Sequence, residues 1–235
     1  MKHGGLYLIP TFLTEDNFLV LPDEVIRKCH SLKYFVVEEE KTARRFLKRI
    51  KHPTPQPDFV FHLHNEHTGK EGLPAVIQLL KEGISIGLLS EAGCPGVADP
   101  GSALVSLAHE QNIRVYPLVG PSSILLSLMG SGLCGQSFCF HGYLPRDPKQ
   151  RQQRMKELEK LALKSGQTQI FIETPYRNMQ LLEDLMNTLQ DETKLCIACE
   201  LTGNNESIRT KTIRVWKKNL PDFHKKPCIF LLGNS

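Results

Sequence analysis

Long apolar runs are what this 235-residue sequence most clearly lacks. None of them approaches the ~20 residues that a membrane-spanning helix requires. The opening segment MKHGGLYLIP also lacks the apolar stretch of a secretory signal peptide. We therefore expect a cytoplasmic protein that has no membrane partner.

Cysteine pairs at zinc-binding spacing are also missing. Cys196 and Cys199 form a CxxC, but it lies inside the apolar run LCIAC, and no second pair follows it. The seven cysteines are an odd number, and most of them lie in apolar runs, as buried free thiols do. We expect reduced thiols and no metal site.

Two common nucleotide-binding fingerprints are absent as well. The sequence contains neither GxGxxG nor a glycine-rich loop that ends in GK[ST]. It also shows no internal repeat and no low-complexity segment. A Rossmann-type dinucleotide site and a P-loop are therefore not expected.

The sequence does contain strand and helix patterns that alternate along its first half. Apolar segments such as YFVVEE and ISIGLLS are typical of strands, and they are separated by amphipathic stretches such as EKTARRFLKRI. This alternation predicts an α/β fold with a mostly parallel sheet. After residue 117 several strand patterns follow closely, including KLCIACEL, IRTKTIRVW and KPCIFLLG, which favours a mixed sheet. We expect domains at 1–117 and 118–235, with the boundary near Leu118.

The loop SEAGCPGVADPG, residues 90–101, follows an apolar strand pattern without alternation, which is typical of a strand covered on both faces. In parallel α/β sheets, ligands bind beyond the carboxyl ends of the strands. Gly93 allows a close approach of the backbone to a ligand, and Asp99 can accept from a ligand or cap a helix beginning near Ser102. A polar ligand site and a structural turn both remain possible on these grounds.

This loop resembles the S-D-A-G-T-P-x-x-S-D-P-G segment of the ribosomal RNA small-subunit methyltransferase I family, within the tetrapyrrole methylase superfamily. Six further segments resemble that family in the same order along the chain. They are VEEEKTARRFL, FHLHNEH, RVYPLVGPSS, HGYLPRDPKQRQQR, IFIETPYR and ACELTGNNE. Because seven landmarks share one order, the resemblance covers nearly the whole chain.

The resemblance implies two α/β domains, with S-adenosylmethionine bound in the cleft between them, and a homodimer. It also implies methyl transfer to the 2′-oxygen of a cytidine ribose in ribosomal RNA of the small subunit. Carried over by position, the cofactor-binding residues are Pro10, Ser90, Ala92, Gly93, Val97, Asp99, Ser122, Ser123, Phe171, Ile172 and Leu201.

A ribose hydroxyl is a poor nucleophile that needs a base or an orienting carboxylate. Glu66 and Asn65 match a family landmark and are the first candidates, followed by Glu39 and His64. Glu39 is equally explained as an acid that favours a helix N-terminus, and His64 as a residue that binds loop backbone. Glu200 is a further candidate, or a group that bonds backbone N–H groups in the pocket.

Basic residues gather in two clusters although the net charge is only +4. Such segregation favours contact with an RNA phosphate backbone over a merely solvated surface. The expected substrate-binding residues are Lys41, Arg44, Arg45, Arg146, Lys149, Arg151 and Tyr143.

The sequence departs from the family pattern after its first strand. Where the family has A-T-P-I-G-N-L, this chain has PTFLTED, residues 10–16. Where the family has D-T-R-H, this chain has EEKT, residues 39–42. These changes leave two alternatives open: a methyltransferase of a tetrapyrrole or other small molecule, and a non-catalytic cofactor-binding protein. The target nucleotide is not determined by the sequence.

Overall fold

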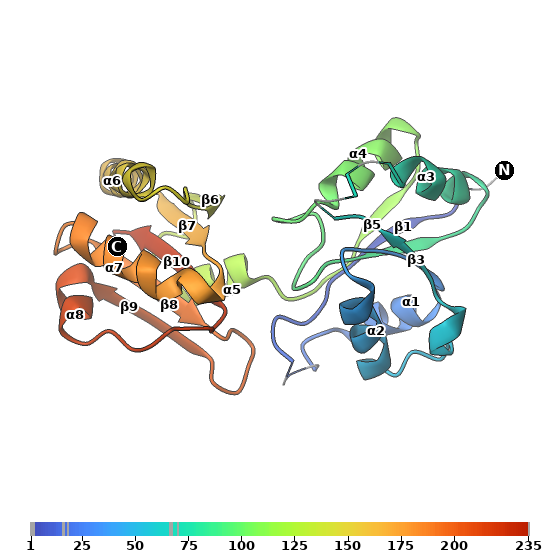
Figure 1. Ribbon diagram of the computed structural model, residues 1–235, viewed down its shortest axis with the longest axis horizontal. Coiled ribbons are helices and arrows are strands. Elements are labelled where there is room, and N and C mark those ends of the chain that lie inside the picture. Colours follow the sequence, from blue (N-terminus) through green and yellow to red (C-terminus); the bar gives the residue numbers. More distant parts are fainter. Residues whose placement is uncertain (1–2, 16, 18, 66–67, 70, 235) are drawn as a thin grey trace. The chain divides into compact units, whose positions relative to one another are not determined.

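The structure is a computed structural model, and it describes residues 3–15, 17, 19–65, 68–69 and 71–234. The chain divides into two compact units, residues 1–122 and 123–235 (Figure 1). The division falls a few residues after the boundary expected near Leu118.

The first unit is built on a five-stranded sheet in which every neighbouring pair is parallel. Its strand order is β3-β2-β4-β1-β5. The strands are β1 Leu6–Ile9, β2 Tyr34–Val37, β3 Val60–Leu63, β4 Ile86–Leu89 and β5 Val115–Pro117. β4 is buried along its whole length, as its unbroken apolar pattern predicted.

Helices cover both faces of this sheet (Figure 1). On one face lie α1 Asp23–His30 and α2 Glu40–Arg49, and on the other α3 Leu73–Lys81 and α4 Ser102–Glu110, with a short 3₁₀ helix, η1 Gln56–Asp58, before β3. Alternate residues of one strand belong to the two resulting cores. Phe35 packs with the α1 and α2 side, whereas Val36 packs with the α3 and α4 side.

The second unit contains a mixed sheet with the order β6-β7-β10-β8-β9. Only β6 and β7 are parallel, and the other three pairs are antiparallel. The strands are β6 Phe138–Tyr143, β7 Thr168–Ile172, β8 Lys194–Cys199, β9 Ser207–Thr212 and β10 Cys228–Gly233. The expected combination of a parallel and a mixed sheet is confirmed.

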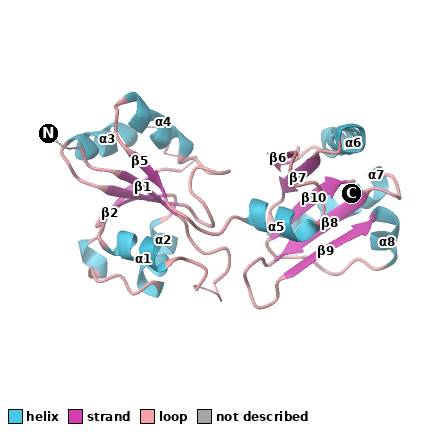
Figure 2. Cartoon of the chain, turned by 180° about the vertical axis from the view of Figure 1, so that it is seen from behind, coloured by secondary structure: helices cyan, strands magenta, loops and turns pink. Residues whose placement is uncertain are grey.

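One face of the mixed sheet carries α6 Pro148–Ser165, α7 Asn178–Thr188 and α8 Ile213–Lys218, and the other carries α5 Ser123–Ser131 (Figure 2). A 3₁₀ helix, η2 Pro175–Arg177, leads into α7. The core under the three helices includes Trp216, which is fully buried and donates its indole N–H to the Leu195 carbonyl at 2.9 Å.

The prediction of one strand over IRTKTIRVW is wrong in its second half. The strand ends at Thr212, and α8 begins at Ile213. Ile213 and Trp216 are three residues apart and both fully buried, which is a helical spacing. Packing of this pair against the core overrides the β propensity of the local sequence.

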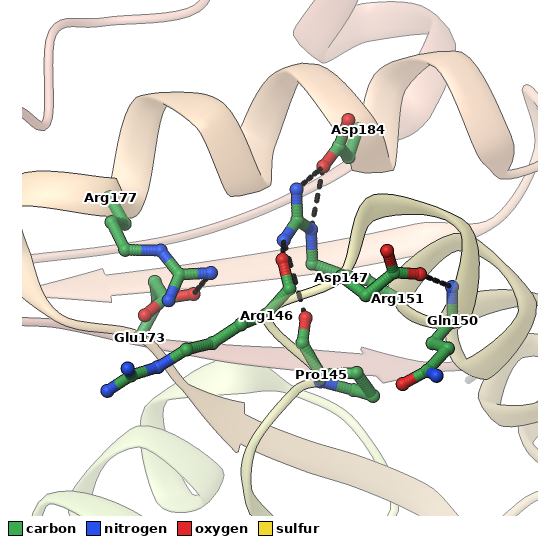
Figure 3. A network of polar contacts seen from close by, with 8 residues as sticks. All are labelled: Pro145, Arg146, Asp147, Gln150, Arg151, Glu173, Arg177 and Asp184. Atoms are coloured by element: carbon green, nitrogen blue, oxygen red, sulfur yellow. Dashed lines mark hydrogen bonds and ion pairs between the residues drawn. The ribbon is translucent and has the colours of Figure 1, made fainter.

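A buried ion pair joins α6 to α7 (Figure 3). The Nε and NH2 atoms of Arg151 lie 2.7 and 2.5 Å from Asp184 Oδ2, and its NH1 donates to the Arg146 carbonyl at 2.8 Å. The two charged side chains are only 4% and 10% exposed. The guanidinium of Arg151, which was expected among the substrate-binding groups, is therefore buried and occupied by contacts inside the second unit.

Asp184→Leu should destabilise the second unit by about 3–5 kcal/mol, because it leaves the Arg151 cation buried without its counter-ion. The matched control is Glu157→Leu. Glu157 is the exposed ion-pair partner of Arg154 within α6, so this change should lower the free energy of unfolding by less than about 1 kcal/mol. Urea unfolding followed by fluorescence reports on this unit alone, since Trp216 is the single tryptophan. Equal destabilisation in the two variants would contradict the prediction.

Candidate functional site

The loops that follow β1, β2 and β4 lie together at the carboxyl edge of the parallel sheet. They enclose a cavity of about 160 Å³. Its walls are mainly apolar, with hydroxyl and charged groups among them. The lining residues are Thr11, Phe12, Leu13, Thr14, Glu15, Val37, Thr42, Ala43, Arg45, Phe46, Arg49, Leu89, Ser90, Glu91 and Ala92.

Two side-chain contacts tie α2 to the loops around this cavity. The Thr42 hydroxyl donates to Glu91 Oε1 at 2.6 Å, and Arg45 forms an ion pair with Glu15. The Thr14 hydroxyl oxygen is buried and has no hydrogen-bond partner among the described residues. Arg45 was expected among the substrate-binding residues, and Thr14 and Glu15 belong to PTFLTED, the segment in which the sequence departs from the family pattern.

The loop 90–101 has a defined backbone shape at Gly93. This residue is buried with φ +76°, a conformation that side-chain-bearing residues rarely adopt. Its carbonyl accepts from the Ser90 hydroxyl at 2.8 Å and from the Thr11 N–H at 2.9 Å. A Cβ atom here would lie 3.1 Å from Leu13 Cδ2 and 3.3 Å from the Pro121 carbonyl oxygen. The loop therefore packs closely against the segment after β1.

Asp99 closes the second half of this loop. Its Oδ1 accepts from the Gly96 and Gly101 N–H groups, each at 2.8 Å. The expected alternative of a helix cap is wrong in detail, because α4 begins after Gly101 with no side-chain cap. Burial raises the pKa of Asp99, although the bonds from Gly101 and Gly96 and the nearby His64 partly oppose this.

His64 links this loop to the one after β3. Its Nε2 lies 2.9 Å from the Pro100 carbonyl oxygen and its Nδ1 2.9 Å from that of Gly69. An imidazole N–H can donate to a backbone carbonyl from either ring nitrogen, depending on the tautomer. Both ring nitrogens of the buried His64 lie against backbone carbonyls. This arrangement favours the second interpretation of His64, that it holds loop backbone, over the first, that it acts as a base.

The other candidates for the base have different surroundings. Asn65 forms a local turn, in which its Oδ1 accepts from the Thr68 N–H at 3.1 Å and its Nδ2 donates to the Glu38 carbonyl at 3.1 Å. Glu39 is exposed just before α2. Glu66 lies outside the described residues.

The expected cofactor-binding residues fall in both units. In the first unit, Pro10, Ser90, Ala92, Gly93, Val97, Asp99 and Ser122 follow the carboxyl ends of β1, β4 and β5. In the second unit, Ser123 begins α5, whereas Phe171, Ile172 and Leu201 lie at the ends of β7 and β8 or just beyond. Phe171 is fully buried and stacked on Phe230 at 5.8 Å, so its side chain belongs to the core of the second unit.

The expected substrate-binding residues also divide. Those with exposed side chains are Lys41, Arg45, Tyr143, Arg146 and Lys149. Arg44, by contrast, is engaged within the first unit: it pairs with Glu40, donates to the Gln56 carbonyl and lies over the Phe61 ring at 4.7 Å.

Among the residues that the structure describes, no group of three or more His, Cys, Asp or Glu side chains is arranged to hold a metal ion. In the same part of the chain, no helix has both the length and the apolar character needed to cross a membrane.

Comparison with known proteins identifies the family. Residues 24–215 match the family model of the tetrapyrrole (corrin/porphyrin) methylases. Two relatives are called ribosomal RNA small subunit methyltransferase I. The protein of Vibrio cholerae is 31% identical, and the match covers 87% of this chain and 67% of that protein. The protein of Buchnera aphidicola is 33% identical, and the match covers 98% of this chain and 78% of that protein. The match to the Haemophilus influenzae relative of that name, 33% identical over 76% of this chain, spans 61% of that protein.

Solved structures agree in fold. The methyltransferase CobJ superposes with a TM-score of 0.65 at 18% identity, over 99% of this chain and 95% of that one. A uroporphyrin-III C-methyltransferase from Thermus thermophilus, complexed with S-adenosyl homocysteine, superposes with a TM-score of 0.60 at 13% identity, over 98% of each chain. The family model and the extent of the sequence matches show that the chain belongs to the tetrapyrrole (corrin/porphyrin) methylases and, among them, to the ribosomal RNA small subunit methyltransferase I family.

Proposed function

We propose that this chain transfers a methyl group from S-adenosylmethionine to the 2′-oxygen of a cytidine ribose in small-subunit ribosomal RNA. The proposal is carried by the position of the loop 90–101. Its backbone is closely packed at Gly93, and it follows β4 at the edge of a parallel sheet where ligands bind in such folds. The name shared by its relatives supports ribosomal RNA as the substrate. We further propose a homodimer that acts in the cytoplasm on RNA or on the small subunit.

The residues of the loop fit this cofactor. Gly93 keeps the backbone free of a side chain where the loop meets the segment after β1. Asp99 uses Oδ1 to hold the loop, and its carboxylate places negative charge where a positively charged ligand would be stabilised. When bound, the cofactor supplies a methyl group on a cationic sulfur, which is already electrophilic.

The protein must then align the acceptor oxygen and exclude water. The apolar walls of the cavity beside the loop, including Phe12 and Phe46, suit a nucleobase. We assign the orientation of the acceptor proton to the segment 64–66 or to Glu39. Within the segment, Asn65 is held by its local turn, and an amide can orient a hydroxyl without taking its proton.

RNA binding is assigned to the exposed basic residues. Lys41 lies in the first turn of α2, adjacent in sequence to the cavity-lining Thr42. Arg146 and Lys149 lie at the start of α6, a few residues after the exposed Tyr143. Arg45 remains in this set, although RNA would have to compete with Glu15 for its guanidinium. Arg44 and Arg151 are left out because their guanidinium groups are occupied.

The cavity favours a second candidate, a methyltransferase of a small molecule. It is lined by residues 11–15 of PTFLTED, the segment in which the sequence departs from the family pattern. It also contains the Thr14 hydroxyl, which has no hydrogen-bond partner in the part of the chain that the structure describes. A tetrapyrrole carries several carboxylates, so the basic residues are compatible with this substrate as well.

A methyl-transfer assay distinguishes the two candidates. The purified chain is incubated with tritiated S-adenosylmethionine and small ribosomal subunits from cells that lack this gene, and labelled RNA is mapped with nucleases. We expect label on one ribose 2′-oxygen. Cofactor binding without transfer to RNA would overturn the ribosomal proposal in favour of the small-molecule one.

Asp99→Asn should weaken cofactor binding about tenfold or more while leaving the fold intact, because a hydrogen bond to a charged group contributes roughly 1.5–3 kcal/mol. Because burial raises the pKa of Asp99, its ionised carboxylate lowers the free energy of unfolding at neutral pH. The free energy of unfolding rises as the pH falls through the folded-state pKa and the carboxylate is protonated. The variant should therefore melt at the same temperature as the parent protein or higher.

Calorimetric titration with S-adenosylmethionine checks the affinity, and a melting curve checks the fold. Glu110→Gln is the matched control, since Glu110 is an exposed acid at the far end of α4. Unchanged affinity in Asp99→Asn would remove Asp99 from the proposed site.

Neutralising Arg146 and Lys149 together, each to Gln, should reduce the salt dependence of RNA binding. The slope of log K against log salt concentration should fall by about one for each RNA phosphate that the variant no longer neutralises. Lys164→Gln, at the exposed end of the same helix, changes charge without touching the proposed surface. Binding to a small-subunit RNA fragment is measured by fluorescence anisotropy at several salt concentrations, and identical slopes in all three proteins would contradict this assignment.

A further inference from the structure

Two cysteines that are far apart in the sequence face each other in the second unit. Cys199 ends β8 and Cys228 begins β10, and the antiparallel register places them directly opposite one another. β8 and β10 are neighbours in the sheet (Figure 2). Both side chains point to the face covered by α6, α7 and α8, where they belong to the same apolar core.

The hydrogen-bond pattern shows which kind of pair this is. The Glu200 N–H donates to the Pro227 carbonyl at 2.9 Å, so the residues after Cys199 and before Cys228 are bonded to each other. In an antiparallel sheet this identifies Cys199 and Cys228 as a non-hydrogen-bonded pair, the type in which opposed Cα atoms are about 4.5 Å apart. That separation lies inside the range of about 4.4–6.8 Å found for disulfides.

The thiols already interact in the reduced state. The hydrogen bond from the Cys228 thiol lowers the pKa of Cys199, with help from the charge of Lys226, and it raises the pKa of Cys228. Burial and the charge of Glu200 oppose the effect on Cys199. Cys199 is therefore the thiol favoured as the attacking thiolate, and Cys228 is its resolving partner.

Cys196 cannot pair with Cys199 or with Cys228 in this sheet, although it forms the CxxC motif with Cys199. Leu231 lies opposite Cys196 in the register, and the spacing of three places the two cysteines on opposite faces of β8. The partner of Cys199 is thus determined by the strand register and not by the sequence spacing.

The pair lies beside a turn that carries a proposed cofactor contact. Leu201 sits in this turn between two residues with left-handed backbone, Glu200 at φ 50° and Thr202 at φ 69°. Gly203 donates its N–H to the Glu200 carbonyl at 2.9 Å. Such strained turns are sensitive to small shifts of the strands that hold them.

We propose that Cys199 and Cys228 form a reversible disulfide under oxidising conditions and that this bond controls the shape of the turn at Leu201. A hydroperoxide is the oxidant. The Cys199 thiolate attacks the peroxide oxygen and becomes a sulfenic acid while the O–O bond breaks. The Cys228 sulfur then attacks the Cys199 sulfur, and water leaves with the Cys228 proton. Two thiols are oxidised to one disulfide, and hydrogen peroxide is reduced to two molecules of water.

Access and geometry are compatible with this chemistry. Cys199 and Cys228 are 3% and 9% exposed as whole residues, but they form the last pair of their strands, so local opening of the strand ends is enough to admit the oxidant. A disulfide brings the Cβ atoms to about 3.8 Å, closer than the roughly 4.5 Å or more of an unlinked opposed pair. The strands are therefore drawn together where the turn begins.

The test is oxidation of the reduced full chain with hydrogen peroxide, followed by peptide mapping and thiol titration. We expect one cross-linked peptide pair that contains Cys199 and Cys228, loss of two of the seven thiols, and complete reversal by dithiothreitol. Cys196→Ser is the matched control and should cross-link like the parent protein. Cross-links between other cysteines, or over-oxidation without this cross-link, would overturn the proposal.

The order of attack has its own test. Cys228→Ser keeps a hydroxyl donor next to Cys199, and peroxide should convert Cys199 to a sulfenic acid that dimedone traps. Cys199→Ser should give little trapped product at Cys228. Equal trapping in the two variants would contradict the assigned roles.

The effect on the turn rests on the proposed function and is measured separately. Oxidised protein should bind S-adenosylmethionine about fivefold or more weakly than reduced protein, and the Cys199→Ser variant should show no difference after the same treatment. If the disulfide forms without a change in affinity, its control of the turn is refuted. If the reduced protein fails to bind the cofactor, the proposed function fails, while the disulfide is still judged by the peptide map.

Discussion

The candidate site depends on one constraint, the common direction of the five strands in the first sheet. Because β1, β2 and β4 are neighbours and parallel, the segments that follow them leave from one edge. That edge places PTFLTED, the start of α2 and the loop 90–101 around a single cavity. Side-chain contacts then hold the segments in place: Thr42 bonds to Glu91, Arg45 pairs with Glu15, and Asp99 closes its own loop. The chemistry that we propose is thus set by chain direction first and by individual side chains second.

The second unit depends more on buried polar contacts. Arg151 and Asp184 join α6 to α7, and Glu159 of α6 accepts from the Gln190 N–H at 2.8 Å and from the Thr193 hydroxyl. Glu173 and Arg177, from the segment ETPYR, also pair with each other (Figure 3). Motif residues that carry charge in this unit are therefore used partly for its own architecture. The surface available to the proposed RNA substrate is smaller than a count of basic residues indicates.

The sequence was sufficient for some features and not for others. Strong local signals, such as the unbroken apolar pattern of β4, predicted the strand, its burial and the loop that follows it. Features set by tertiary packing were missed: the α8 helix depends on burial of Trp216, and the engagement of Arg151 depends on Asp184, which is distant in the sequence. The partnership of Cys199 with Cys228 was equally invisible, since strand register creates it. The place of the cavity was indicated by the departure from the family pattern at PTFLTED and by the start of the loop 90–101, but its enclosure by α2 was not.

We propose that the loop 90–101 holds S-adenosylmethionine at the carboxyl edge of the parallel sheet. A crystal structure of the chain grown with S-adenosyl homocysteine, the product that cofactor turnover leaves, tests this placement. We expect ligand density against Gly93, with Asp99 close to the charged groups of the ligand. Density bound elsewhere, with Gly93 and Asp99 free of ligand, would contradict this placement.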